Sequence, residues 1–262
     1  MVELSDSVIT RRARLAERLT TMIEADHRVR KCKSIDFSNE GGALLTVELI
    51  PNSGAISREA IARGGELRSS LGRERPVWIA GSTHAGEEEQ VLEAHRQLQI
   101  GQPNALLLLV PRHPDRFEAV AELLRRGAVR FTRRSSGVPP DRATRVVLVD
   151  TVGELAALYA AGDVAFVGGS LVPVGGHNLL EPAALGLPVL TGPSYSSSKD
   201  IARLLILQGA ALEVADARAL AAALARLLDD PAARQRMGDI GRHIVESNRG
   251  SLARLLELIE PL

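Results

Sequence analysis

Between residues 76 and 215, short runs of apolar residues alternate with longer stretches whose apolar positions recur at helical spacing. Because the short runs are continuously apolar, they predict strands that are buried on both faces of a parallel sheet. We expect strands at residues 77–81, 105–110, 146–150, 164–169 and 188–192. The stretches between and after them predict helices at residues 86–99, 115–126, 153–162, 178–186 and 199–209.

This alternation is typical of a doubly wound α/β domain, a parallel sheet with helices on both faces. From residue 216 onward the pattern is helical only, so we expect C-terminal helices and no further strand. The first 55 residues do not follow the alternation, although a helix is expected at 11–31 and a strand at 42–50. We therefore predict an irregular N-terminal segment at 1–55, either a remnant or unrelated, followed by a Rossmann-like domain at 56–262.

The composition narrows the possible functions. Lys and Arg together number 32, as do Asp and Glu, and aromatic residues make up only 3% of the chain. Such a balance disfavours a nucleic-acid partner, so any anion has to be bound by a few local groups. The single cysteine, Cys32, excludes an internal disulfide and a multi-cysteine metal site. No stretch approaches the roughly 20 apolar residues of a membrane span, so we expect a soluble chain.

In an open parallel sheet, ligands bind at the carboxyl ends of the strands. Arg112 follows one predicted strand, and the segment GGSLVPVGGHNLLEP, which contains two glycine pairs, follows another. Within this segment Asn178 and Glu181 have the spacing of a helix N-terminus, with Asn178 as the N-cap. Since the amides of a helix N-terminus attract anions, we expect a phosphate there, and Gly175 and Gly176 would let it approach closely.

Thr151 and Glu154 repeat the spacing of Asn178 and Glu181 at a second predicted helix start. A plainer interpretation stays open: the glycine pairs are simple turns, Glu154 and Glu181 only cap helices, and Arg112 is a solvated surface charge.

Other chemistries find little support in the sequence. His84, His113 and His177 all fall at predicted strand ends, but they lack the spacing of a metal site, so we expect no metal. The sequence contains no G-x-S-x-G element, no P-loop and no G-x-G-x-x-G fingerprint.

Several motifs resemble the C-terminal half of 3-deoxy-D-manno-octulosonic acid (Kdo) transferases, from about Gly64 to the C-terminus. They are WIAGSTHAGEEE (78–89), LVPRHPDRF (109–117), RRSSG (133–137), DTVGELAALYAAGDVAFVGGS (150–170) and FVGGSLVPVGGHNLLEPAALGLPVLTGP (166–193). The resemblance implies the C-terminal, CMP-Kdo-binding domain of a GT-B glycosyltransferase. That enzyme moves Kdo from CMP-Kdo to a lipid A precursor, in lipopolysaccharide biosynthesis, at the cytoplasmic face of the bacterial inner membrane.

The resemblance also implies which residues contact CMP. They are Pro111, Arg112, Gly153, Glu154, Leu155, Asn178, Leu179, Leu180 and Glu181. Arg112 and the helix N-termini would hold the phosphate, and Glu181 would accept hydrogen bonds from the ribose hydroxyls. No cofactor is implied.

The chain departs from the family pattern in two places. In the family, an acceptor-binding N-terminal half carries the catalytic glutamate and a membrane anchor. We expect neither here, so no catalytic residue is assigned, and the chain alone is expected to be soluble, cytoplasmic and inactive. The missing lobe would supply the contacts with the acceptor and the membrane. Residues 193–198 (PSYSSS) also differ from the family's His and aromatic residues.

Two alternatives from other classes stay open at this point. The chain could be a non-catalytic nucleotide-binding module, which would not transfer sugar even with an N-terminal lobe added. It could also be another GT-B enzyme, such as a sugar-nucleotide epimerase, which competition between CMP and UDP would reveal.

Overall fold

The computed structural model describes residues 29–37, 43–49 and 56–248. The chain divides into two units, one formed by residues 1–52 with 247–262 and the other by residues 53–246. In the first unit, β1 (Val29–Phe37) pairs antiparallel with β2 (Ala43–Leu49). Strand β2 confirms the strand predicted at 42–50. The helix predicted at 11–31 is wrong for its last three residues, which belong to β1, and the rest of it lies outside the described residues.

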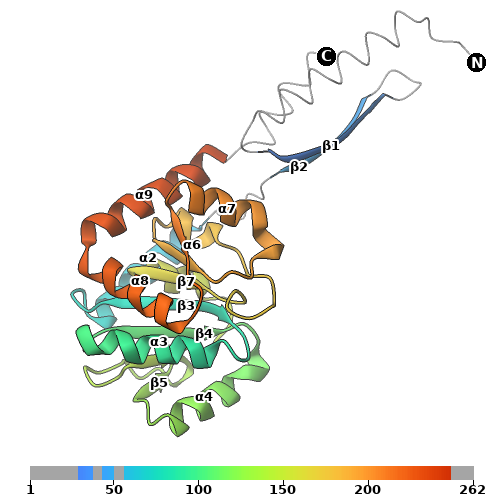
Figure 1. Ribbon diagram of the computed structural model, residues 1–262. Coiled ribbons are helices and arrows are strands. Elements are labelled where there is room, and N and C mark those ends of the chain that lie inside the picture. Colours follow the sequence, from blue (N-terminus) through green and yellow to red (C-terminus); the bar gives the residue numbers. More distant parts are fainter. Residues whose placement is uncertain (1–28, 38–42, 50–55, 249–262) are drawn as a thin grey trace, which may run out of the picture. The chain divides into compact units, whose positions relative to one another are not determined.

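The second unit is built on a seven-stranded parallel sheet (Figure 1). Its strands are β3 (Val77–Thr83), β4 (Leu106–Pro111), β5 (Phe131–Arg133), β6 (Val146–Leu148), β7 (Val164–Val167), β8 (Val189–Thr191) and β9 (Ala211–Glu213). They are arranged in the order β5-β6-β4-β3-β7-β8-β9. The five predicted strands are confirmed. Strands β5 and β9 were not predicted, because each has three residues and only partial burial.

Helices connect the strands and continue beyond the last one. They are α2 (Arg58–Leu71), α3 (Glu88–Gly101), α4 (Phe117–Arg126), α5 (Leu155–Ala160), α6 (Leu180–Ala184), α7 (Lys199–Leu207), α8 (Ala217–Asp229) and α9 (Pro231–Asn248). Single 3-10 turns are η1 (Pro114–Arg116), η2 (Arg134–Ser136) and η3 (Ser196–Ser198). Helices α5 and α6 are shorter than predicted, and α2 was not predicted. In the described part of the chain, no helix combines the length and apolar character that crossing a bilayer requires.

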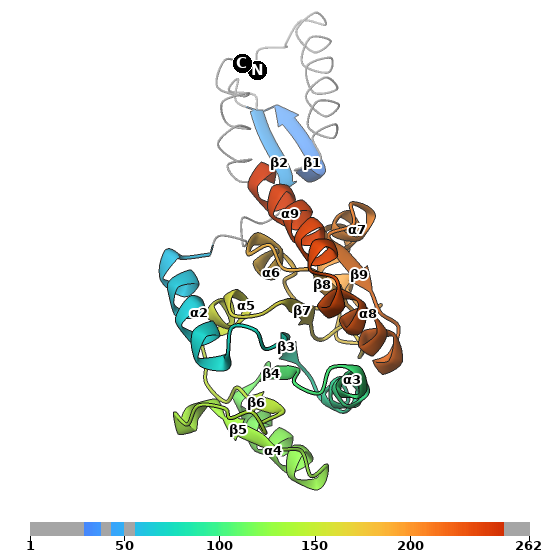
Figure 2. The same ribbon diagram turned by 90° about the vertical axis from the view of Figure 1, so that its left-hand side faces the viewer.

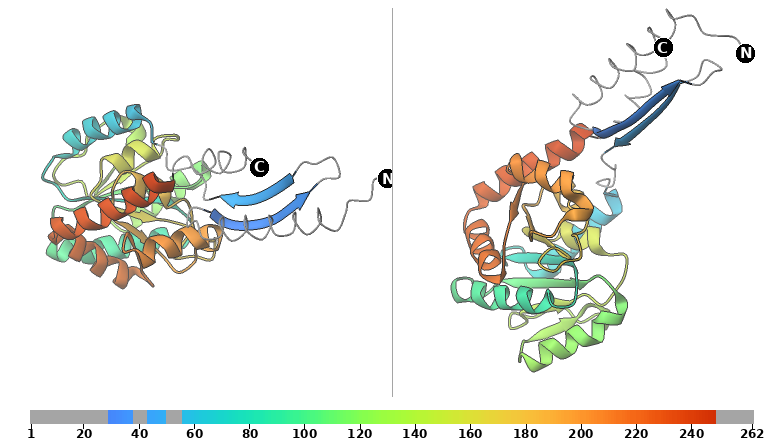
Figure 3. Two further views of the ribbon diagram at one scale, coloured as in Figure 1. Left: turned by 90° about the horizontal axis from the view of Figure 1, so that it is seen from above. Right: turned by 45° about the vertical axis from the view of Figure 1, so that its right-hand side comes forward.

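The apolar runs are buried on both faces of the sheet. In β3, Trp78 and Ala80 belong to one core layer together with residues of α3, α4 and α8. Val77 and Ile79 belong to the other layer, with residues of α2 and α5. Figures 2 and 3 show these helices on the two faces of the sheet. The predicted doubly wound α/β fold is therefore confirmed, and a strand buried on both sides explains why its apolar run is continuous.

The order of the strands creates a switch point between β3 and β7. From β3 the chain first builds the β4, β6 and β5 side of the sheet, and then returns to add β7, β8 and β9 on the other side. The connections after β3 and β7 consequently diverge, and a crevice opens between them at the carboxyl edge of the sheet.

We predict that Gly64→Ala and Gly65→Ala change stability in opposite directions. A Cβ at position 64 would lie 2.4 Å from the Ala160 Cβ and 2.8 Å from the Ala157 carbonyl oxygen. Helix α2 would have to move away from α5, so we expect the free energy of unfolding to fall by about 1–3 kcal/mol. At position 65 nothing lies within 4 Å of the added Cβ. There alanine should raise the free energy of unfolding by about 0.5–1 kcal/mol through its helix propensity.

Urea denaturation measures both effects, and Gly65→Ala is the matched control because it lies in the same helix. Equal stabilisation by the two substitutions would contradict the close packing of α2 on α5.

Candidate functional site

A cavity of about 570 Å3 lies at the carboxyl edge of the sheet, at the switch point. Five of the nine residues that the sequence proposed as nucleotide contacts line it. They are Arg112, Gly153, Leu155, Asn178 and Glu181. Arg112 follows β4, while the other four surround the first residues of α5 and α6. The fold thus brings together residues that are far apart in the sequence, and places a cation and a carboxylate in one cavity.

Three further candidates can offer only main-chain groups to this cavity. Leu179 and Leu180 are buried with 0% and 4% exposure, and their side chains are part of the core. Pro111 is the buried last residue of β4. If these three residues contact a ligand, the contact is made by their backbone.

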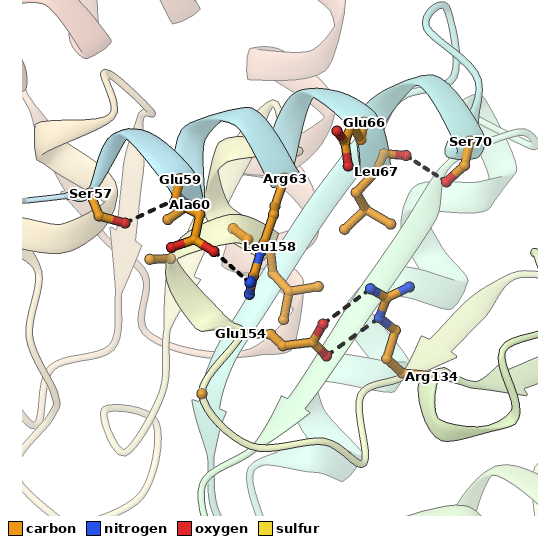
Figure 4. A pocket seen from close by; sticks show the side chains of 13 residues that line it. Ser57, Glu59, Ala60, Arg63, Glu66, Leu67, Ser70, Arg134, Glu154 and Leu158 are labelled. Atoms are coloured by element: carbon orange, nitrogen blue, oxygen red, sulfur yellow. Dashed lines mark hydrogen bonds and ion pairs between the residues drawn. The ribbon is translucent and has the colours of Figure 1, made fainter.

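The ninth candidate, Glu154, lines a neighbouring cavity of about 680 Å3 between α2 and α5. Its carboxylate lies 3.1 Å from Nη2 of Arg134, as Figure 4 shows. It also accepts a short hydrogen bond from the Thr151 hydroxyl. Any role of Glu154 at the first cavity would therefore fall to its backbone.

The predicted capping arrangement of Thr151 and Glu154 is wrong. Helix α5 begins at Leu155, so Glu154 precedes the helix instead of occupying its first turn, and no side chain caps this end. Gly153 has a φ of +86°, which interrupts helical geometry just before this point. The Glu154 carboxylate accepts hydrogen bonds from the Thr151 hydroxyl and from Arg134, in place of bonds from backbone amides.

The Asn178 cap is displaced by one residue from the prediction. Helix α6 begins at Leu180, with Leu179 at the N-cap position. The Asn178 Oδ1 nevertheless accepts the Leu180 N–H at 3.0 Å, and the Asn178 Nδ2 donates to the Glu181 Oε1 at 3.1 Å. Asn178 thus holds the Glu181 carboxylate in place at the cavity wall.

Helices α5 and α6 contain six and five residues, fewer than two turns each. Only a few aligned peptide units then contribute to the positive partial charge at each N-terminus. Arg112 is consequently the main positive charge among the residues that line the cavity.

The loop after β7 is held by Glu87, which the sequence predicted only as part of a helix. Glu87 is fully buried, and its carboxylate accepts the N–H groups of Gly169 at 2.7 Å, Ser170 at 3.0 Å and Leu171 at 2.9 Å. It also accepts the His84 N–H at 3.2 Å. The signal in the sequence was the run of three glutamates at 87–89. A solvent-exposed helix start does not require any of these glutamates to be buried.

The glycine pair at 175–176 accommodates the chain itself. The N–H groups of Gly175 and Gly176 both donate to the Gly169 carbonyl oxygen, and the Ser197 N–H donates to the Gly175 carbonyl oxygen at 2.9 Å. A Cβ on Gly175 would lie 2.7 Å from the Ser196 and Ser197 hydroxyl oxygens. The expectation that these glycines let a ligand approach is wrong, because residues 194–197 occupy that space.

The three histidines that the sequence placed at strand ends lie together. Nε2 of His177, which lines the cavity, is 2.7 Å from Nε2 of His84, and the two ring planes differ by 11° with centroids 5.0 Å apart. The His113 ring meets His84 edge-on at 5.5 Å. Burial lowers the pKa of His177 to about 4, with His84 and Arg112 adding to the shift, and burial also lowers the pKa of His84. Across residues 29–37, 43–49 and 56–248, no group of three or more His, Cys, Asp or Glu could hold a metal ion.

The parallel sheet with its cavity at the switch point is a Rossmann-like domain, and the family model for glycosyl transferases group 1 matches residues 142–244. The domain is therefore a glycosyltransferase domain of the GT-B fold. A crystal structure of the C-terminal CMP-Kdo binding domain of WaaA from Acinetobacter baumannii is 35% identical, with a TM-score of 0.68 over 72% of this chain and 98% of that domain. The chain belongs to the 3-deoxy-D-manno-octulosonic acid transferase family.

Curated relatives agree with this assignment. The 3-deoxy-D-manno-octulosonic acid transferase of Haemophilus influenzae is 46% identical over 204 residues, which are 78% of this chain and 48% of that enzyme. The enzyme of Bordetella pertussis is 42% identical over 190 residues, 71% of this chain and 44% of that enzyme. The chain thus matches about half the length of these relatives.

We predict that Glu87→Gln strongly destabilises the domain. An amide in place of the carboxylate keeps one acceptor oxygen but turns an NH2 group toward backbone N–H groups. Buried donors then lose their partners, so we expect the free energy of unfolding to fall by about 2–4 kcal/mol. Chemical denaturation measures the loss. Glu89→Gln, on an exposed residue two positions away, is the control and should change stability by less than about 0.5 kcal/mol. Equal stabilities of the two variants would contradict the role of Glu87.

Proposed function

We propose that the second unit, residues 53–246, is a donor-binding domain whose cavity takes the CMP group of CMP-Kdo. We further propose that the enzyme transfers Kdo to a lipid A precursor in lipopolysaccharide biosynthesis. The support is the likeness to a domain described as CMP-Kdo binding, which this chain covers almost completely at 35% identity. The observation that carries the proposal is the meeting of Arg112, Asn178 and Glu181 in one cavity.

The charges of these residues suit a ribonucleotide monophosphate. Arg112 is exposed at the cavity, where its planar guanidinium can donate parallel hydrogen bonds to phosphate oxygens. The Glu181 carboxylate accepts hydrogen bonds, which suits a pair of ribose hydroxyl donors. The Asn178 amide, bonded to Glu181 at 3.1 Å, fixes the orientation of that carboxylate before any ligand arrives. The site would thus bind the nucleotide with one cation and one preorganised hydrogen-bond acceptor, in place of a cluster of basic residues.

This arrangement would act on the leaving group of the transfer. When the bond between the Kdo anomeric carbon and the phosphate oxygen breaks, its electron pair remains on the phosphate. Arg112 and the amides that begin α5 and α6 would stabilise the added negative charge. By the family resemblance, the base that deprotonates the acceptor hydroxyl belongs to the acceptor-binding half, which works at the cytoplasmic face of the inner membrane.

We predict that Arg112→Ala weakens CMP binding about 10- to 100-fold, because charge-assisted hydrogen bonds to the phosphate are lost. Titration calorimetry with CMP and with cytidine separates this role from a structural one. Cytidine lacks the phosphate, so its affinity should hardly change in Arg112→Ala. Arg126→Ala, an exposed arginine of α4, is the control. An unaltered CMP affinity in Arg112→Ala would refute the phosphate contact.

We predict that Glu181→Gln weakens CMP binding about tenfold or more, through loss of the charged acceptor for the ribose hydroxyls. The loss should be smaller for 2′-deoxy-CMP, in which one of those two hydroxyls is missing. Calorimetry with both nucleotides measures the difference. A loss of the same size for CMP and 2′-deoxy-CMP would show that Glu181 supports the fold of the cavity and does not bind the 2′-hydroxyl.

A further inference from the structure

His84 and His177 form a hydrogen-bonded pair across the switch point. His84 lies in the connection after β3, and His177 lies in the connection after β7. Their Nε2 atoms are 2.7 Å apart and the ring planes differ by 11°. Since both nitrogens are of the same kind, one must carry the proton and the other must accept it. The two rings therefore share one N–H group between them and have opposite tautomers.

The surroundings of this pair favour its neutral form. Burial lowers the pKa of both rings, and that of His177 falls to about 4. Arg112 and His113 face both rings and act in the same direction, as Arg116 does for His84. Glu87, whose carboxylate accepts the His84 N–H, is the group that acts in the opposite direction. A second negative charge on the cavity side would tip this balance toward protonation.

We propose that the His84–His177 pair is the proton acceptor of the donor site and takes up one proton when the nucleotide phosphate lies beside Arg112 and His177. This inference rests on the proposed function, because it requires a phosphate in the cavity that Arg112 and His177 line. Once protonated, the pair holds the added proton while its Nε2–Nε2 hydrogen bond becomes charge-assisted. The protonated pair is then a second positive charge beside Arg112.

The charge balance of the reaction explains what such a proton would do. The phosphate of CMP-Kdo is a diester with one negative charge. Once the bond to the sugar breaks, the phosphate oxygen keeps the electron pair and CMP leaves as a monoester with close to two negative charges near neutral pH. One proton from solvent added to the neutral histidine pair offsets the extra charge. Nothing is oxidised or reduced, and no further reactant is needed.

The first test follows the imidazole nitrogens by NMR in the full chain, which has six histidines. Spectra are recorded from about pH 8 to pH 5, without ligand, with CMP and with cytidine. We expect CMP to raise the apparent pKa of the pair by about three units, while cytidine leaves it unchanged. Saturation with CMP without any change in the titration of His84 and His177 would overturn the inference.

The second test uses His177→Gln, whose Nε2 can still donate to His84 but cannot titrate. One proton taken up on binding increases the affinity for CMP by up to about tenfold per pH unit as the pH falls. We expect the unmodified chain to bind CMP about fivefold to tenfold more tightly near pH 6.5 than at pH 8. At pH 6.5 the phosphate of CMP is still largely dianionic. His177→Gln should gain less than about twofold in CMP affinity between pH 8 and pH 6.5. His243→Gln, an exposed histidine of α9, is the control and should keep the full gain.

The outcomes separate this inference from the proposed function. If CMP binds and His177→Gln keeps the full pH-dependent gain, the inference is wrong and the donor site stands. If His177→Gln binds weakly at every pH, the NMR titration of the unmodified chain decides between a titrating pair and a structural one. If CMP does not bind to the unmodified chain at any pH, the proposed function fails, and the inference fails with it.

Discussion

The site depends on the buried carboxylate of Glu87. A charge without solvent is costly unless it is fully hydrogen-bonded, and Glu87 meets that condition with four backbone N–H groups. Three of these groups come from the loop after β7 and one from the connection after β3. Because the same carboxylate binds both loops, they are held together at the switch point where the strands diverge. No pair of apolar side chains could impose this alignment on two loops rich in polar backbone groups.

Much of the geometry around the cavity follows from that alignment. A Cβ at Gly168 would lie 2.6 Å from the Ser82 carbonyl oxygen and 2.8 Å from a Glu87 oxygen, so only glycine lets the two loops approach this closely. The Gly169 carbonyl oxygen then accepts the N–H groups of both Gly175 and Gly176. These bonds direct the chain toward His177 and Asn178. On the other side, the Arg112 N–H donates to the Thr83 carbonyl oxygen at 2.9 Å and joins β4 to the same cluster. Backbone contacts thereby position the segments that carry Arg112, the histidine pair and Glu181, and the Asn178 side chain orients the Glu181 carboxylate.

The sequence was sufficient for the doubly wound fold because burial on both faces leaves an unbroken apolar run, as in β3 and β4. It was insufficient for β5 and β9, whose three residues gain their place from neighbouring strands and carry little pattern of their own. Of the candidate residues, Arg112, Gly153, Leu155, Asn178 and Glu181 do line one cavity. The direction of Glu154 could not be predicted, since its partner Arg134 lies 20 residues away on another element. Likewise, Gly175 and Gly176 receive the chain's own residues 194–197, a tertiary contact that leaves no local signal.

A crystal structure of the chain with CMP bound would test directly whether the switch point binds the nucleotide. We expect the phosphate beside Arg112 and His177, with the ribose hydroxyls within hydrogen-bonding distance of Glu181 and the Glu87 contacts unchanged. CMP bound in the neighbouring cavity between α2 and α5, beside Arg134, would refute this placement, because the residues at the switch point would then have no part in recognising the nucleotide.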